Sequence, residues 1–119
     1  MIKIKIKKLI TTHAIRQYAD VSKDTAAIHL NTEVAVITGY KRPIAHGMYV
    51  MGLAQSIYLN EHPTKWIINY SMKFQMPLLV DTVAIFEYRE HNNEVEVSIT
   101  VETGEVIASG TFSVKEWSL

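Results

Sequence analysis

An aspartate and a histidine five residues apart form a possible acid–base pair. Asp24 and His29 lie within residues 22–29, and Ile28 places an apolar side chain next to the histidine. A carboxylate accepts protons, and a histidine ring both gives and takes a proton near neutral pH. Sharing one water, the two groups would suit the addition or removal of water across a double bond. In the alternative interpretation, Asp24 caps a turn and His29 is an ordinary surface histidine.

A second motif, RPIAHGM at residues 42–48, stands at the start of a long apolar stretch. The free N–H groups at the start of a helix favour negative charge. Gly47 has no side chain to keep a ligand carbonyl from the backbone, so its N–H can stabilise the enolate oxygen of a thioester. Alternatively, Gly47 serves helix packing alone.

Periodic patterns outline the elements that must position these motifs. Isoleucine and lysine alternate over residues 2–7, which predicts a strand with lysines facing outward, although a nucleic-acid-binding arm is an alternative. Short helices are expected from Thr11 or Thr12 to residue 19, and over residues 31–37 before Gly39. Residues 45–60 are apolar nearly all round, which predicts a buried helix.

The second half of the chain has the pattern of antiparallel strands. Strands over 66–75 and 79–88 flank Pro77, and a turn at 91–93 leads into an alternating strand over 94–101. A turn at 102–105 precedes a last strand, in which Val106 and Ala108 are expected on the same face. A buried helix followed by hairpins predicts an α+β fold, with a curved antiparallel sheet wrapped around one long central helix.

Length and composition restrict the class of protein. The 119 residues predict one domain over 1–119, and 12 basic residues balance 12 acidic ones, so no net charge favours nucleic acid or membrane. The N-terminus lacks the apolar core of a secretory signal, no apolar run reaches the roughly 20 residues of a membrane span, and there is no cysteine. We therefore expect a cytoplasmic protein without nucleic-acid or membrane partners.

Three other histidines show no metal-ligand spacing. His13, His62 and His91 fall in a capping region and in two turns, and we expect all three at the surface. Neither a phosphate-binding glycine loop nor a dinucleotide fingerprint is present in the sequence. The sequence therefore predicts no metal and no nucleotide cofactor.

The two motifs, in this order, resemble the MaoC-like family of (R)-specific enoyl-CoA hydratases and dehydratases. The resemblance rests on YADVSKD at 18–24, on the Ile-His pair at 28–29 and on RPIAHGM. The segment KFQMPLLVDT at 73–82 also resembles the family's passage between two strands, with its proline. The resemblance implies a hot-dog fold, usually dimeric, and hydration of trans-2-enoyl-CoA to (R)-3-hydroxyacyl-CoA.

The resemblance also implies roles for individual residues. Asp24 and His29 fall on the pair that holds the catalytic water, and Gly47 on the residue whose N–H helps to bind the thioester oxygen. His46 and Met48 flank Gly47 and are predicted to bind substrate. The same prediction covers Gln55, which stands where well-known hydratases have a serine, and the adjacent Ser56.

The loop departs from the family pattern at three positions. Lys23 replaces a glycine before the aspartate, and Ala26 and Ala27 replace an Asn-Pro pair between aspartate and histidine. Alanine supplies neither the hydrogen bonds of asparagine nor the stiffness of proline, so we expect a looser loop.

The sequence thus favours a carbon–oxygen lyase of fatty acid metabolism. Its substrate would be an acyl thioester of CoA or acyl carrier protein, with CoA as part of the substrate, and the chain would form a homodimer or a multiple of dimers. An acyl-CoA thioesterase is the first alternative, because it needs the same groups but releases a free thiol. A non-catalytic acyl-thioester-binding subunit is the second, and the three substitutions in the loop favour it.

Overall fold

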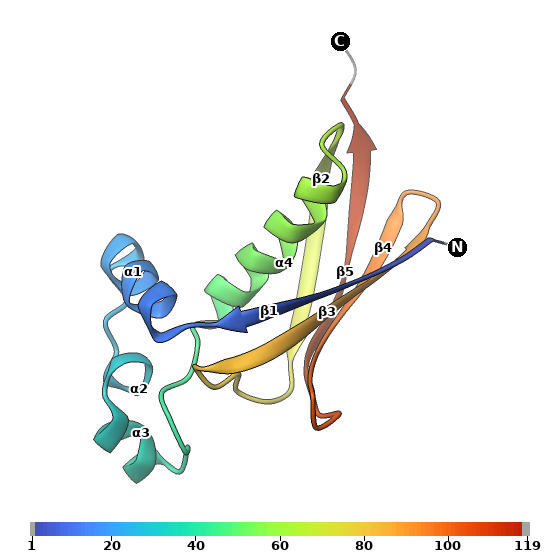
Figure 1. The fold of residues 1–119 in the computed structure, drawn as a ribbon. Coiled ribbons are helices and arrows are strands. Elements are labelled where there is room, and N and C mark those ends of the chain that lie inside the picture. Colours follow the sequence, from blue (N-terminus) through green and yellow to red (C-terminus); the bar gives the residue numbers. More distant parts are fainter. Residues whose placement is uncertain (1, 118–119) are drawn as a thin grey trace.

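The computed structural model describes residues 2–117 and shows a five-stranded antiparallel sheet curved around one long helix (Figure 1). The strands stand in the order β1-β3-β4-β5-β2, which leaves β1 and β2 at the two edges. This architecture confirms the predicted α+β class. The strand bounds are β1 (Ile2–Ile10), β2 (Lys65–Phe74), β3 (Thr82–His91), β4 (Glu94–Val101) and β5 (Val106–Glu116).

The central helix α4 (Gly47–Glu61) lies against the concave face of the sheet (Figure 1). Its side chains are apolar on most sides, and the buried ones pack on the inward-facing residues of the strands. Phe86, Tyr88 and Phe112 are at most 1% exposed, so the sheet contributes its largest side chains to this contact. Within residues 2–117, no helix is long and apolar enough to cross a membrane.

Three short helices gather at the end of the molecule where α4 begins (Figure 1). These are α1 (Thr12–Ser22), α2 (Ala27–Leu30) and α3 (Thr32–Thr38), and we call residues 12–38 the helical segment. The Thr11 hydroxyl caps α1, the Asn31 side chain caps α3, and Gly39 ends α3 with a φ of 109°. The predicted caps at Thr11 and Gly39 are therefore confirmed.

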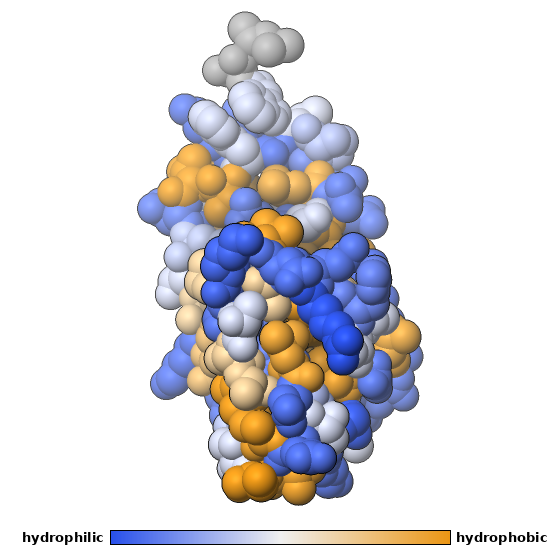
Figure 2. Space-filling model, turned by 90° about the vertical axis from the view of Figure 1, so that its left-hand side faces the viewer, coloured by the Kyte–Doolittle hydropathy of each residue, from blue (hydrophilic) through white to orange (hydrophobic). Residues whose placement is uncertain are grey.

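The helical segment buries little apolar surface of its own. Ile15, Ala19 and Ala35 are its buried residues, whereas Val21 and Ile37 are 83% and 85% exposed. Apolar groups accordingly show among polar ones in the view onto this side of the molecule (Figure 2). Hydrogen bonds to the rest of the chain must therefore help to hold the segment in place.

Strand β3 begins three residues later than the sequence predicts, because the preceding residues pair elsewhere. The Ala45 N–H donates to the Leu78 carbonyl at 2.8 Å, and the Val80 N–H donates to the Pro43 carbonyl at 2.9 Å. Residues 78–80 thus form a short antiparallel bridge with the segment that leads into α4. Alternation alone does not distinguish this bridge from the strand that follows it.

The start of β5 also departs from the expected alternation. Ile107 and Ala108 are both buried, whereas Val106 is 37% exposed. A shift of register at Ile99/Thr100 of β4 places an extra residue of β5 opposite its partner strand. Such a bulge turns the side chain before it to the other face.

His62, expected at the surface, instead takes part in a buried polar cluster at the C-terminal end of α4. Its Nε2 lies 2.8 Å from Oε1 of Glu90, which is 7% exposed, and its Nδ1 lies 3.1 Å from the Tyr58 carbonyl oxygen. The Tyr58 hydroxyl donates to the same carboxylate. Both ring nitrogens of His62 thus face hydrogen-bond acceptors, which join the end of α4 to β3.

Two tyrosine hydroxyls join the sheet to the middle of α4. Tyr70 donates to the Met51 carbonyl at 2.9 Å, and Tyr88 donates to the Ala54 carbonyl at 2.6 Å. Burial raises the pKa of Tyr70 to about 12 and the pKa of Tyr88 well above its ordinary value. Burial and the neighbouring Glu90 also raise the pKa of Tyr58.

Because the pKa values of these tyrosines are raised in the folded state, we expect the protein to lose stability at alkaline pH. A tyrosine with a raised pKa in the folded state keeps its proton there after the unfolded chain has lost it, so the free energy of unfolding falls as pH rises above about 10. For Tyr70 the fall continues to about pH 12. Melting temperatures between pH 8 and pH 12 measure the effect, which should be smaller in Tyr88→Phe. A melting temperature that is constant over this range would contradict the prediction.

Candidate active site

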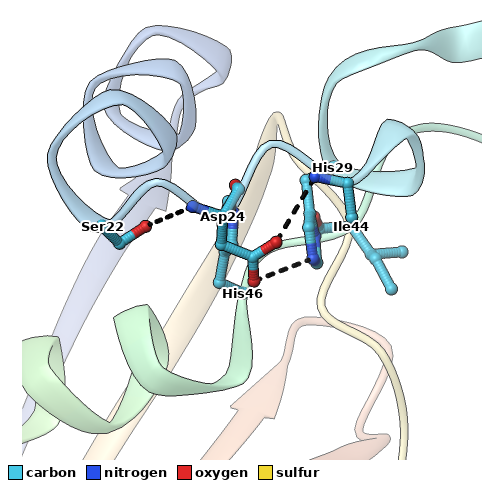
Figure 3. A network of polar contacts seen from close by, with 6 residues as sticks. Ser22, Asp24, His29, Ile44 and His46 are labelled. Carbon is cyan, nitrogen blue, oxygen red and sulfur yellow. Dashed lines mark hydrogen bonds and ion pairs between the residues drawn. The ribbon is translucent and has the colours of Figure 1, made fainter.

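Asp24 and His29 come together beside the entrance to α4 (Figure 3). Asp24 stands two residues after the end of α1, beyond Lys23, which has a positive φ of 64°, and His29 lies on α2. The His29 Nε2 is 4.0 Å from Oδ2 of Asp24. The Asp24 side chain is 53% exposed and that of His29 is 10% exposed. The carboxylate is therefore open to solvent, whereas the histidine ring is mostly buried.

The aspartate both holds its loop and faces the histidine. The Ala26 N–H donates to Oδ1 of Asp24 at 3.3 Å, and the Asp24 N–H donates to the Ser22 hydroxyl at 3.2 Å. The other carboxylate oxygen, Oδ2, is the one near His29. The turn-capping interpretation and the acid–base interpretation of Asp24 are therefore compatible, because each uses a different oxygen.

The hydrogen bonds of His29 fix which of its nitrogens is protonated. Nδ1 lies 2.7 Å from the Ile44 carbonyl oxygen, which can only accept, so Nδ1 carries the hydrogen. In the neutral ring Nε2 then has a lone pair, and this lone pair faces the Asp24 carboxylate. Two hydrogen-bond acceptors thus face each other across 4.0 Å, which is too wide for a direct hydrogen bond.

His46 lies beneath the pair and is 3% exposed, although the sequence predicts it among the substrate-binding residues. Its ring stacks on His29 with centroids 3.7 Å apart and planes at 21°, and Tyr18 packs against it edge-on at 4.8 Å. His46 Nε2 is 2.9 Å from the backbone carbonyl oxygen of Asp24 (Figure 3). The sequence shows no sign of these contacts, because 17 residues separate the two histidines.

Asp24, His29 and His46 are also the kinds of side chain that bind metals. Their donor atoms lie within 4.8 Å of one another. Two features oppose a shared metal, however. The nearly parallel rings of His29 and His46 direct their lone pairs side by side, whereas a tetrahedral ion needs them to converge. His46 Nε2 also already faces the Asp24 carbonyl. The geometry suits proton transfer better than metal binding.

Gly47 follows His46 as the first residue of α4 and lines an open cavity. The first hydrogen bond of this helix runs from the Val50 N–H to the His46 carbonyl, so the preceding N–H groups have no partner within the helix. A Cβ atom built on Gly47 would lie 3.5 Å from the Phe74 ring, in ordinary contact. The cavity, of about 320 Å³, is otherwise lined by Tyr40, Ala45, Val50, Phe74, Gln75, Met76, Pro77, Leu78 and Ile107.

A larger cavity of about 530 Å³ continues from this one. The two share Tyr40, Met76, Pro77 and Ile107, and charged residues, among them Lys41, Arg42 and Glu105, also line the larger one. Together they make a groove of mixed polarity that starts at the N-terminus of α4. Asp24 and His29 line neither cavity, and His46–Gly47 connects the pair to the groove.

The remaining predicted substrate-binding residues lie on α4. Met48 is 66% exposed in the first turn. Gln55 and Ser56 stand eight and nine residues after Gly47, about 12 to 14 Å along the helix, and line neither of the two cavities. The structure therefore groups Gly47 with the acid–base pair and sets Gln55 and Ser56 apart. Their roles stay predictions.

Two contributors to the site were missed in the sequence. The Ile44 backbone carbonyl orients His29, and no side-chain type signals such a role. Phe74 at the end of β2 covers Gly47, but an apolar residue at a strand end is too common to single out.

Comparisons with known proteins identify relatives of this chain. Two curated (R)-specific enoyl-CoA hydratases match 66% of the chain each. The one from Rhodospirillum rubrum is 35% identical over 81 residues, and the one from Aeromonas caviae is 29% identical over 80 residues. These matches span 56% and 60% of the relatives' own lengths, less than two thirds of either.

A solved structure and a family model cover more of the chain. The structure of the A. caviae (R)-hydratase involved in PHA biosynthesis superposes with a TM-score of 0.84 at 23% identity, over 98% of this chain and 95% of that one. This likeness confirms the hot-dog fold. The family model described as "MaoC like domain" matches residues 2–111, and the chain therefore belongs to the MaoC-like family.

Proposed function

We propose that the protein interconverts trans-2-enoyl thioesters and (R)-3-hydroxyacyl thioesters, as a hydratase in one direction and a dehydratase in the other. The observation that carries the proposal is the pair of acceptors, Asp24 Oδ2 and His29 Nε2, facing each other across 4.0 Å. A molecule between them must donate two hydrogen bonds, and a water molecule does so. The (R) configuration is taken from the curated relatives.

The pair acts on this water as a unit. In hydration, the water oxygen bonds to C3 of the enoyl group, and one water proton passes to the pair, with Asp24 as the main base. The electrons of the C2–C3 double bond move toward the thioester oxygen and form an enolate. The pair then returns the proton to C2, so no net proton is gained or lost. Dehydration follows the same steps in reverse.

The N-terminus of α4 supplies the complementary charge. The N–H of Gly47 donates to the thioester oxygen, where negative charge builds up in the enolate. The groove that starts at Gly47 offers room for the acyl chain or for the carrier's arm. CoA, acyl carrier protein and a cytoplasmic location stay predictions, as does a place in fatty acid metabolism.

An assay with crotonyl-CoA and a longer enoyl-CoA tests the proposal. Loss of the enoyl absorbance without release of thiol indicates hydration, whereas release of thiol from acyl-CoA indicates a thioesterase. Asp24→Asn keeps an oxygen for the Ala26 N–H but removes the base, and His29→Gln removes the titrating ring. Each should lower kcat by roughly 10²- to 10⁴-fold, and the double variant should be little worse than the poorer single one.

The control for this pair is Thr25→Ala, in the same loop, which should keep most activity. Melting temperatures of all variants separate a lost turn cap, which costs about 1 kcal/mol, from a catalytic defect. Near wild-type turnover in both single variants would eliminate the mechanism. Tight acyl-CoA binding without turnover in the wild type would instead favour the non-catalytic alternative.

A second prediction concerns the approach of the thioester to the helix. Gly47→Ala should fold normally, because its Cβ meets the Phe74 ring at an ordinary 3.5 Å. The same methyl group would stand beside the N–H donor, and we expect kcat/KM to fall by roughly 10²-fold. Gly52→Ala is the matched control, because its Cβ would have no neighbour within 4 Å among residues 2–117 and alanine favours the helix. Equal activity of the two variants would leave Gly47 only a packing role.

We further propose that two copies of the chain pair through β2. This edge strand carries Trp66, Ile68 and Phe74, whose exposed fractions are 43%, 52% and 41%. Ile68 lies in a bulge between Ile67 and Asn69 and faces no partner in β5. Because Phe74 contacts the position of Gly47, a second copy on this edge would also cover the mouth of the groove.

Sedimentation velocity at micromolar concentration tests this pairing. The wild type should sediment as a dimer or a multiple of dimers, and Ile68→Lys should shift it toward the monomer, because a charge on an edge strand opposes pairing. Ile37→Lys, at an 85% exposed site on α3, is the control and should leave the assembly unchanged. A wild type that is strictly monomeric would refute the proposal.

A further inference from the structure

We infer that His46 is a positioning residue, whose neutral ring, protonated at Nε2, holds both Asp24 and His29 in place. The inference rests on the proposed function but depends on different contacts. His46 is 3% exposed and touches both members of the pair, one through a hydrogen bond and the other through its ring face. A side chain so deeply buried acts on the substrate only through its neighbours.

The proton on His46 can be assigned from its surroundings. Nε2 lies 2.9 Å from the backbone carbonyl oxygen of Asp24, which can only accept, so Nε2 carries the hydrogen. Nδ1 is buried, and no hydrogen-bond partner lies near it among the described residues. A second proton there would be a buried donor without an acceptor, at the positive end of α4, and both conditions disfavour it. His46 is therefore neutral.

The two stacked rings consequently carry their hydrogens on opposite nitrogens. His29 donates from Nδ1 to Ile44 and keeps its Nε2 lone pair toward Asp24, whereas His46 donates from Nε2 to Asp24. A neutral ring beneath His29 leaves it free to accept a proton without a second positive charge 3.7 Å away. The Tyr18 ring also packs edge-on against the His46 ring, with centroids 4.8 Å apart.

The bond to the Asp24 carbonyl also restrains the loop. Asp24 stands after a residue with positive φ, and its side chain is 53% exposed, so few packing contacts fix its direction. The His46 Nε2–H ties the backbone of Asp24 directly to the N-cap of α4. Because Gly47 is the next residue, the bond also sets the distance between the base and the oxyanion donor.

Nitrogen-15 spectra of the histidine rings test the assignment without any assay of activity. At neutral pH, His46 should show a protonated Nε2 and an unprotonated Nδ1, and His29 the reverse. A His46 ring protonated on both nitrogens would overturn the inference. Amide hydrogen exchange over residues 24–29 should accelerate in His46→Phe, which keeps a ring on His29 but loses the donor. Unchanged exchange would also overturn it.

Three variants then separate the hydrogen bond from the ring. His46→Phe and His46→Asn both lose the bond to Asp24, since asparagine is too short to reach, and their kcat should fall about 10²-fold with little change in KM. His46→Gln can place an N–H near the position of Nε2 and should retain at least about tenfold more of kcat than His46→Asn. His62→Gln, at the other end of the same helix, is the control and should keep wild-type kcat even if its melting temperature falls.

The outcomes separate this inference from the proposed function. If the wild type shows no hydration, the proposed function fails, while the tautomers and the exchange of the loop still decide the role of His46. If hydration is present but KM rises at constant kcat in His46→Asn, His46 binds substrate, and the positioning role is wrong. If activity falls only with the folded fraction in all three variants, the role is purely structural.

Discussion

The burial of α4 is the constraint from which the rest of the structure follows. A helix that is apolar on most sides must bury a face, and the sheet covers the face that carries Val50, Ala54, Ile57 and Tyr58. Tyr70 and Tyr88 donate to carbonyl groups in the middle of this helix. At its N-terminal end the helix begins at Gly47, which is exposed to a cavity. The first N–H groups of α4 are therefore accessible at the one place where the acid–base pair also lies.

Residues 43–46 join this helix terminus to the pair. On one side they pair with residues 78–80, and on the other they bind the helical segment, through the Ile44 N–H to Ile28 at 3.0 Å and the Ile44 carbonyl to His29. These bonds tie α2 to the segment that leads into α4. Within the loop, where Ala26 and Ala27 replace the family's Asn-Pro pair, an Asp24 oxygen accepts from the Ala26 N–H.

The sequence predicted those parts of the molecule that depend on local pattern. Alternation located β4, and the all-round apolar stretch located α4. The spacing of Asp24 and His29 left two interpretations open, and the family resemblance favoured the acid–base pair. Contacts between distant segments were not predictable. Because residues 78–80 bridge to residues 43–45, β3 begins later than predicted. The bulge opposite Thr100 turns Val106 outward. The His62–Glu90 pair joins residues 28 positions apart. In each case a tertiary partner determines the outcome, and neither periodicity nor residue type shows which partner it is.

The two histidines at the ends of α4 differ in the hydrogen-bond partners that face their rings. His62 at the C-terminal end has acceptors near both nitrogens, Glu90 Oε1 and the Tyr58 carbonyl. His46 at the N-terminal end has one acceptor, and its buried Nδ1 has no partner among the described residues, which suits the neutral ring. The end of the helix that would stabilise the proposed enolate thus also disfavours a cation beside it.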